Sequence, residues 1–315
     1  MNPIVDNIRT MAKELLEKGE VEAVIGFRQG SLPLSTEPTM ATTPEEANSL
    51  TWDANCRLNL AAYLTKERGK VAVVAKGCDS RNIVGHIVEN RIKREDVVII
   101  GVPCTGMIDA GKAATMAQAE ILDAVENDET IILTTAAGET RAAKTDLLRQ
   151  NCSLCTHRNP VISDMMAGEP VPEQADIDRY ADIREIESKP SDEKWAFFDE
   201  AFSACTRCYA CKNACPLCYC PTCFVDESRP QWVGKGTDPV DVRTYHMLRA
   251  VHCAGRCTEC GACESACPMG IPVRLLTRKM EKTVGERWGL EAGLSTETRP
   301  AQDTFRLDDP EEFIM

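Results

Sequence analysis

The stretch HCAGRCTECGACESACPMGIP, residues 252–272, contains one complete CxxCxxCxxxCP run of four cysteines. They are Cys257, Cys260, Cys263 and Cys267, the last followed by Pro268. Three thiolates at this spacing can bind three corners of one cubane 4Fe–4S cluster. The fourth cysteine, turned away at the proline, is left to ligate a partner cluster. A fold built around this run therefore needs a second cysteine run. Its fourth cysteine would complete the cluster of this run, and Cys267 would complete the cluster of the second run.

A second run of the same form, CTRCYACKNACP, occupies residues 205–216. Because the fourth cysteine of each run ligates the other cluster, the two runs define two ligand sets. The first set is Cys205, Cys208, Cys211 and Cys267, and the second is Cys257, Cys260, Cys263 and Cys215. We therefore predict two 4Fe–4S clusters, which would make the chain a carrier of single electrons.

Other common uses of cysteine fit this pattern less well. Zinc sites usually pair two short CxxC couplets rather than two runs of four. The cysteines number 17, an odd count, and the opening stretch MNPIVDNIRTMAKELLEKGE is charged and lacks the apolar region of a signal peptide. We therefore expect no disulfide framework. Cysteines that bind iron must not be oxidised to disulfides, so we predict that the protein lies in a reducing cytoplasm, that of an anaerobe.

Length and charge narrow the class further. The 315 residues, 43% of them hydrophobic, can form two domains with real cores. A net charge of −13 argues against binding to nucleic acid or to an acidic membrane surface. No run approaches 18 apolar residues, so we expect no membrane span.

Residues 1–163 predict an α/β domain. Short apolar segments rich in β-branched residues alternate with helical ones, which favours a mainly parallel sheet covered on both faces. The predicted strands are Val21–Phe27, Val71–Ala75, Val97–Gly101 and Ile131–Thr135. The predicted helices are residues 4–16, 56–63, 81–90, 113–125 and 141–149, and residues 28–50 are expected to be rich in turns.

Unusual residues follow the strands Val71–Ala75 and Val97–Gly101. In parallel sheets, ligands gather at these carboxyl ends of the strands. The loop Lys76–Arg81 leads into a helix, and the N–H groups near Ser80 could hold an anion such as a cofactor pyrophosphate. Lys76 and Arg81 would add positive charge. The alternative is a capped helix with Asp79 or Ser80 as the N-cap.

Four further cysteines belong to this domain. Cys78 and Cys104 follow different strands and should lie close together at one edge of the sheet. Cys152 and Cys155 form a CxxC just after the last predicted helix. Together the four predict a third 4Fe–4S cluster, with a redox-active CxxC or a zinc site as the alternative. Cys56 is expected to be an unligated thiol.

Five segments, VEAVIGFRQG, TPEEANSLTWDANCRLNLAAYL, VAVVAKGCDSRNIV, VVIIGVPCTGMID and NCSLCTHRNP, resemble one family over roughly residues 21–165. It is the beta-subunit family of coenzyme F420-reducing hydrogenases and F420-dependent formate dehydrogenases. The resemblance implies FAD beside a 4Fe–4S cluster and hydride transfer to the deazaflavin. It implies Cys78, Cys104, Cys152 and Cys155 as cluster ligands. It implies a flavin near Lys76, Gly77, Asp79, Ser80, Arg81, Thr105 and Gly106.

The chain departs from this family in two respects. The family usually shows an Asp after the CxxC, where this chain has His157 one residue later. Its additional ferredoxin segment follows the domain instead of preceding it. Of the four histidines, His86, His246 and His252 are expected in surface or core roles, whereas His157 is a candidate for tuning the neighbouring cluster.

Residues 195–287 predict a mainly α-helical dicluster ferredoxin domain. The spacing of its cysteine runs resembles the helical ferredoxin module of fumarate reductase iron–sulfur subunits and heterodisulfide reductase subunits. Helices are expected at residues 195–202, 240–251 and 273–284. The acidic, proline-containing stretch 164–194 is expected to be a linker, and residues 288–315 an extended tail.

Four cysteines remain, in CPLCYCPTC and just before the second run: Cys218, Cys220, Cys223 and Cys253. They can hold a fourth cluster, ligate a metal in part, or shield the neighbouring clusters as buried thiols.

We therefore expect an iron–sulfur subunit, with or without FAD, that relays electrons to a flavin or deazaflavin acceptor in an anaerobic redox complex. The expected partner is a formate dehydrogenase or hydrogenase catalytic subunit, or a heterodisulfide-reductase-like flavoprotein. A flavin-free adaptor between two enzymes is the first alternative. A thiol–disulfide reductase that uses the spare cysteines is the second.

Overall fold

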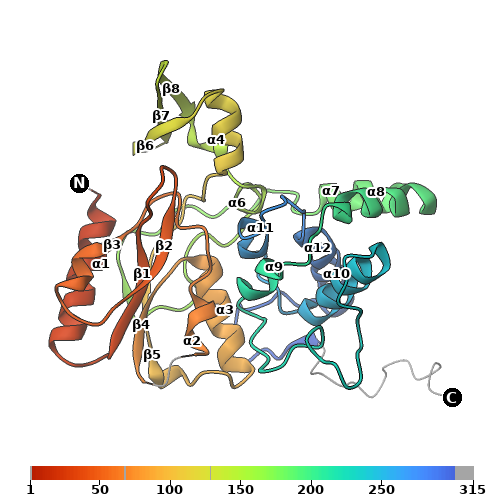
Figure 1. The fold of residues 1–315 in the computed structure, drawn as a ribbon. Coiled ribbons are helices and arrows are strands. Elements are labelled where there is room, and N and C mark those ends of the chain that lie inside the picture. Colours follow the sequence, from red (N-terminus) through yellow and green to blue (C-terminus); the bar gives the residue numbers. More distant parts are fainter. Residues whose placement is uncertain (1, 67–68, 128, 302–315) are drawn as a thin grey trace.

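The computed structural model describes residues 2–66, 69–127 and 129–301. An α/β unit, from the first helix to β9, and a helical unit, from α7 to α12, lie side by side (Figure 1). In the part of the chain that is described, no helix is long and apolar enough to cross a membrane.

The α/β unit is built on a mixed, mostly parallel sheet. Its strands are β1 (Ala23–Gln29), β2 (Thr36–Ala41), β3 (Leu50–Thr51), β4 (Val71–Ala75), β5 (Val97–Gly101) and β9 (Met165–Met166). The main order is β2-β1-β4-β5-β9, in which β1, β4, β5 and β9 run parallel and β2 and β3 pair antiparallel with β1. Every residue of β4 is buried, as a strand covered on both faces requires. The strands predicted at residues 71–75 and 97–101 are confirmed.

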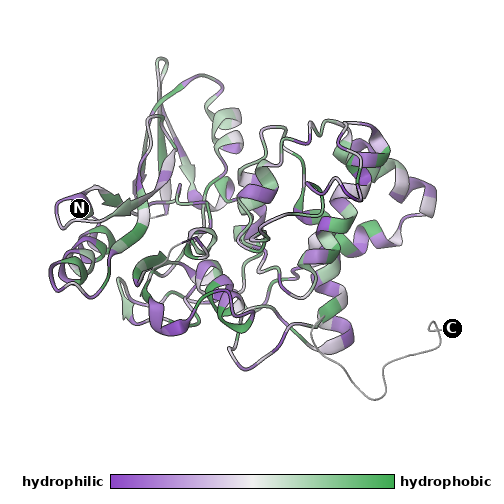
Figure 2. Cartoon of the chain, turned by 60° about the horizontal axis from the view of Figure 1, so that its bottom comes forward, coloured by the Kyte–Doolittle hydropathy of each residue, from purple (hydrophilic) through white to green (hydrophobic). Residues whose placement is uncertain are grey.

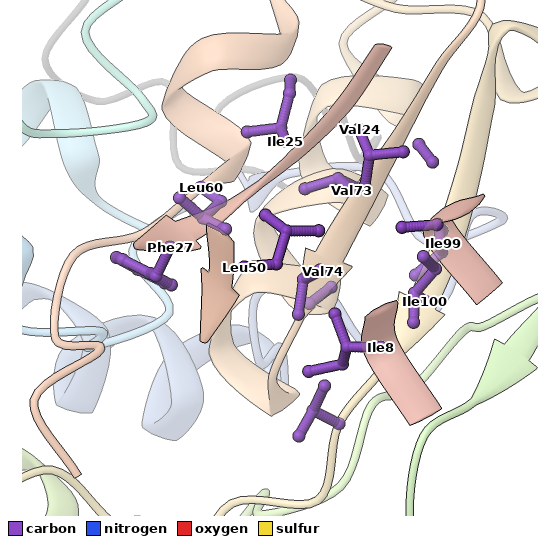
Figure 3. Packing of buried hydrophobic residues seen from close by; sticks show 14 of the residues in the cluster. Ile8, Val24, Ile25, Phe27, Leu50, Leu60, Val73, Val74, Ile99 and Ile100 are labelled. Carbon is purple, nitrogen blue, oxygen red and sulfur yellow. The ribbon is translucent and has the colours of Figure 1, made fainter. Parts of the chain in front are cut away.

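Helices cover this sheet on its two faces: α1 (Pro3–Glu17) on one, and α2 (Ala61–Leu64) and α3 (Gly77–Val88) on the other (Figure 1). Asn2 caps α1 by accepting a hydrogen bond from the backbone N–H of Ile4. The core between these layers is aliphatic, and Ile8 of α1 packs near Val24 and Ile100 (Figure 3). Figure 2 shows hydrophobic residues concentrated along the strands. Burial of each such side chain stabilises the fold by roughly 1.5–3 kcal/mol.

A second, separate sheet corrects part of the prediction. It contains β6 (Ile121–Asn127), β7 (Thr130–Thr135) and β8 (Gly138–Ala143), all antiparallel, beside α4 (Ala110–Ala117) and α5 (Lys144–Leu147). The strand predicted at residues 131–135 exists but does not join the parallel sheet, and the helices predicted at 113–125 and 141–149 are wrong over most of their length. Burial alternates along β7, with Ile131 and Leu133 inside, which is the period of a strand packed on one face.

Local side-chain hydrogen bonds explain two further differences. The helix predicted at residues 56–63 shortens to α2, because Asp53 and Asn59 accept hydrogen bonds from the N–H groups of Asn55 and Ala61 and hold turns instead. The stretch 28–50, predicted as turns, contains β2 and a short 3-10 helix, Glu46–Ser49. The helix predicted at 81–90 begins earlier, at Gly77.

The helical unit contains the three helices expected there, each somewhat longer, and three shorter ones. They are α7 (Ala181–Ser188), α8 (Ser191–Ser203), α9 (Ala210–Asn213), α10 (Pro239–Cys253), α11 (Ala262–Ser265) and α12 (Arg274–Trp288), with α6 (Gln150–Ser153) leading in from the α/β unit. The two cysteine runs adopt matching backbones. Tyr209 and Gly261 both take left-handed conformations, with φ of 60° and 73°, just before α9 and α11. These two short helices contact each other.

The acidic stretch 164–194 is more ordered than its composition predicts. Met165 and Met166 extend the main sheet, and α7 packs on α12 with Ile183 buried. Of the predicted tail, Ala292 and Gly293 lie against Arg81 of the α/β unit, and residues 302–315 lie outside the described residues.

Helix α3 docks the two units through one face. Arg81 donates two hydrogen bonds to the carbonyl of Ala292, and Asn82 donates to the hydroxyl of Thr258. Further along, the Glu89 carboxylate pairs with Arg256. Helix α3, which carries Cys78 in its first turn, is therefore anchored to the helical unit at Thr258 within the cysteine run 257–267 and at Arg256 just before it.

Candidate redox site

Four of the five cysteines of the α/β unit come together. Cys78 stands in the first turn of α3 after β4, Cys104 follows β5, and Cys152 and Cys155 lie on and just after α6. All four line one cavity between the two units, as the strand-end positions predicted. Cys260 of the helical unit lines the same cavity.

This cavity is rich in cations. Its lining includes Arg57, Lys76, Arg81, Arg149, Arg158 and Arg274, and its carboxylate is Glu259. Burial, and after it the nearby Cys152, raise the pKa of Cys104 to about 12. Burial also raises the pKa values of Cys78 and Cys155. Thiols held so far from ionisation become thiolates when they bind a metal. Four thiols among cations therefore fit an anionic thiolate-bound cluster.

The loop Lys76–Arg81 is engaged within the protein. Lys76 Nζ donates to Asp79 Oδ2 at 2.8 Å and to the carbonyl of Leu58 at 2.7 Å, with both ionic side chains buried. Asp79 accepts from the N–H of Lys76, so it closes the start of α3. Ser80 Oγ donates to the carbonyl of Gly77 and accepts from the N–H of Val161. The helix is capped, but its N-cap is Lys76, so the prediction of Asp79 or Ser80 at that position is wrong, and Asp79 lies in the first turn.

Gly77 serves packing in the same loop. A Cβ atom there would lie 2.1 Å from the carbonyl oxygen of His157, so only glycine admits this close approach. The side chains of Lys76, Asp79, Ser80 and Arg81 are thus engaged in hydrogen bonds within the protein.

Thr105 lies on a different cavity, of about 440 Å³, and Gly106 lines both this cavity and the cysteine cavity. Its walls include Trp52, Lys144 and the first turn of α1. Lys144 Nζ donates to Thr105 Oγ1 at 2.8 Å and also pairs with Glu126. Its volume is within the range of small-molecule sites. Cys104 lines both this cavity and the cysteine cavity, so the two share a wall.

The first ligand set of the helical unit is assembled around Cys205. Cys211, Cys267 and Cys208 all lie close enough to raise the pKa of Cys205, after burial, which is the largest cause. His246 Nε2 lies 3.3 Å from Cys205 Sγ, and the Tyr245 hydroxyl lies 3.4 Å from Cys211 Sγ. Burial lowers the pKa of His246 to about 4, so its ring is neutral.

These contacts revise the roles of the histidines. His246 is a core residue, as expected, but it is the histidine that contacts a cysteine sulfur. His157 lines the cysteine cavity, where its Nδ1 lies 3.0 Å from Thr156 Oγ1 and 3.5 Å from Glu291. Spacing along α10 could not distinguish His246 from His252.

The second ligand set, Cys257, Cys260, Cys263 and Cys215, lines a third cavity. This cavity shares Cys260, Thr258 and Arg274 with the cysteine cavity of the α/β unit. Asn151 spans the two: its Nδ2 donates to Cys152 Sγ at 3.4 Å and to the carbonyl of Cys260 at 3.1 Å. Nothing in the sequence singled out Asn151.

The leftover cysteines Cys218, Cys220, Cys223 and Cys253 line a fourth cavity, together with Cys215. Cys56 is fully buried in the main core, where burial raises its pKa, as expected for an unligated thiol. Among the described residues, no group of three or more His, Cys, Asp or Glu side chains is placed to hold a single metal ion. In a cubane each thiolate binds a different iron, so its ligands surround a volume and do not converge on one point.

Comparisons with known proteins agree with the N-terminal resemblance. Residues 8–50 match the family model described as coenzyme F420 hydrogenase/dehydrogenase, beta subunit N-term. The F420-dependent formate dehydrogenase subunit beta of Methanocaldococcus jannaschii is 25% identical over 93% of each chain. F420-dependent formate dehydrogenase 1 subunit beta of Methanococcus maripaludis is 24% identical over 93% of this chain and 92% of its own. These comparisons support the resemblance of this chain to that beta-subunit family.

A solved structure of the F420-reducing [NiFe] hydrogenase complex from Methanosarcina barkeri is also similar in part. The match has 15% sequence identity and a TM-score of 0.38, and it covers 49% of this chain and 62% of that one.

Proposed function

We propose that this chain is the electron-transfer subunit of an anaerobic, cytoplasmic oxidoreductase complex. It carries electrons through 4Fe–4S clusters between a partner enzyme and a flavin or deazaflavin acceptor. The observation that supports this most directly is the continuity of the cavities. Cys260 lies on the wall between the second ligand set and the cysteine cavity of the α/β unit, and Cys104 lies on the wall between that cavity and the one at Thr105.

Three cluster sites make up the proposed relay. Two are the crosswise sets of the helical unit, and the third is Cys78, Cys104, Cys152 and Cys155. Arg249 connects the first two sets, because its Nη2 donates to the carbonyl of Cys211 while its charge faces Cys215 and Cys263. Asn151 connects the second set to the third. The protein supplies donors, positive charge and exclusion of water around each site.

We place the flavin in the cavity of Thr105 and Gly106. A bound flavin would link single-electron transfer to hydride transfer. Gly106 has a φ of 104° and lets the backbone pass close to Cys152 and Leu148. Lys144 offers a donor held in place by Thr105 and Glu126, and Trp52 offers an aromatic wall.

The relatives' names guide the choice of partner. Both are F420-dependent formate dehydrogenase beta subunits. We therefore propose coenzyme F420 as the acceptor and a formate dehydrogenase or hydrogenase catalytic subunit as the partner, with a heterodisulfide-reductase-like flavoprotein as the other candidate.

One observation favours the flavin-free adaptor as a second candidate. The loop Lys76–Arg81, where a flavin phosphate was expected, is occupied by internal hydrogen bonds. In that case the same clusters would connect two enzymes, and reduction of F420 would occur on another subunit.

The test is anaerobic purification of the full chain with iron, acid-labile sulfide and flavin measured on one sample. About twelve iron atoms or more and one FAD per chain are expected. The Lys144→Met variant should lose flavin and keep its iron. Lys112→Met is the matched control, because Lys112 Nζ donates to the carbonyl of Leu148 outside this cavity.

The outcomes separate the candidates. Full iron without flavin would reject the flavin site and leave the adaptor. About eight iron atoms in a fully loaded sample, unchanged in the double variant Cys152→Ser/Cys155→Ser, would reject the third cluster.

A further inference from the structure

The cavity lined by the leftover cysteines, of about 690 Å³, lies between the loop after α9 and helix α10. Cys218, Cys220 and Cys223 come from that loop, and Cys253 from the last turn of α10. Two distant segments thus bring every cysteine outside the three proposed sets, except Cys56, to one place. Chance packing of spare thiols would not gather all four around a single cavity.

Among the described residues, this cavity contains a buried positive charge that pairs with no carboxylate. Arg249 is 4% exposed and lines the cavity. In that part of the chain its Nε is also buried without a hydrogen-bond partner. Its electrostatic neighbours are cysteines: Cys215 and Cys263 of the second ligand set come first, and Cys253 and Cys218 follow. Because a buried guanidinium is unfavourable unless an anion faces it, this arrangement favours negative charge on the cysteines of both sites.

The solvent exposure of these cysteines also favours metal ligation. Cys253 is buried, whereas Cys220 is exposed on the loop. An exposed free thiol is a reactive liability, and a ligated one is not. Lys212 and Arg256, each paired with a carboxylate, also line the cavity and add positive charge.

We propose that Cys218, Cys220, Cys223 and Cys253 bind a fourth 4Fe–4S cluster. A cubane is favoured over a single zinc ion because these thiols line a large cavity and are not placed to hold one ion. The site adjoins the second ligand set, since Cys215 lines both cavities and is hydrogen-bonded to Cys218 and Cys253.

The fourth cluster extends the relay of the proposed function toward the surface. Each transfer moves one electron between neighbouring clusters, and no bond is made or broken and no proton moves. Because Cys220 is exposed, this end of the relay can meet a redox partner of the complex directly. Cys56 is then the single cysteine without a metal role.

The test compares variants of the anaerobically reconstituted full chain. Cys220→Ser/Cys223→Ser changes a surface loop, and Cys253→Ala tests the same site from α10. Each should lose about four iron and four sulfide per chain and one cluster signal in the electron paramagnetic resonance of the reduced protein. The control, Cys56→Ala, should keep full iron.

Unchanged iron in the loop variant, or loss of zinc in place of iron, would overturn the fourth cluster. The result is independent of the proposed function, which depends on the third cluster. Cys152→Ser/Cys155→Ser should remove a different set of about four iron atoms, whatever happens at Cys220 and Cys223.

Discussion

The hydrophobic cores of the two units differ in composition. The core of the α/β unit is aliphatic and includes only Cys56 and Cys152 among its buried cysteines. The smaller core of the helical unit includes Cys211 and Cys263, with Cys205, Cys223 and Cys267 packed against it. We therefore expect the first unit to fold mainly on the hydrophobic effect, whereas the second has a core made partly of cysteines that we propose as metal ligands.

The largest expected effect is that of iron removal. Anaerobic chelation should unfold the helical unit and leave the main sheet intact, because the helical core contains several proposed cysteine ligands whereas the strands of the main sheet contain no cysteine. Hydrogen exchange should show loss of protection in α10 and α12 and retained protection in β4 and β5. Equal loss, or equal retention, in both units would contradict the comparison.

The converse experiment changes the aliphatic core. Ile100 is fully buried, and Ile100→Ala should destabilise the α/β unit by roughly 2–5 kcal/mol in denaturant unfolding. Iron in the two crosswise sets should stay unchanged. Val125→Ala is the control: Val125 is half exposed, so its effect should stay within about 0.5 kcal/mol. Loss of crosswise iron in Ile100→Ala would mean that the units do not fold separately.

A smaller effect is expected where the two units meet. In the native protein the N–H donor of Asn151 to Cys152 Sγ stabilises the more negative, reduced state of the proposed third cluster. The Asn151→Ala substitution removes this donor. Its midpoint potential should become more negative in a redox titration.

Asn82→Ala is the matched control for this change. Asn82 also joins the two units, but it donates to the carbonyl of Cys78 and the hydroxyl of Thr258 and not to a sulfur. An equal shift in both variants would show that docking, not the sulfur contact, sets the potential.

The smallest effect concerns pH. His86 of α3 is buried against the carbonyl of Pro216, and burial lowers its pKa below the ordinary value of 6.5. The unfolded chain therefore takes up a proton near pH 6.5 that the folded chain does not, and stability falls as the pH drops below that value. His86→Gln, which keeps a donor, should lessen this fall in thermal unfolding between about pH 7.5 and 5.5. An unchanged slope would exclude His86 as its source.

Much of the architecture follows from local sequence. The buried strands β4 and β5 are continuous apolar runs, so their positions were correct to the residue. The crosswise sets depend on spacings of a few residues within each run, and the chain brings Cys267 to Cys205 as those spacings imply. Cys78 and Cys104 met because parallel strands end at one edge of a sheet.

Other features were decided only by the tertiary structure. Strand β7 lies outside the main sheet, because pairing with β6 and β8 buries its one apolar face. The residues of β7 alone do not reveal which strands it pairs with. The Lys76 side chain donates a hydrogen bond to Asp79, and the Arg81 side chain donates one to the carbonyl of Ala292. These partners are in place only in the folded chain.

Sequence by itself therefore located the central strands and predicted which cysteines form the crosswise sets, because short covalent spacings and apolar periodicity are local properties. The structure decided which cavities adjoin, and that Asn151, His246 and Arg249 contact or face the cysteine sulfurs. Those contacts join residues far apart in the chain, and their hydrogen bonds and charges exist only once both units have packed together.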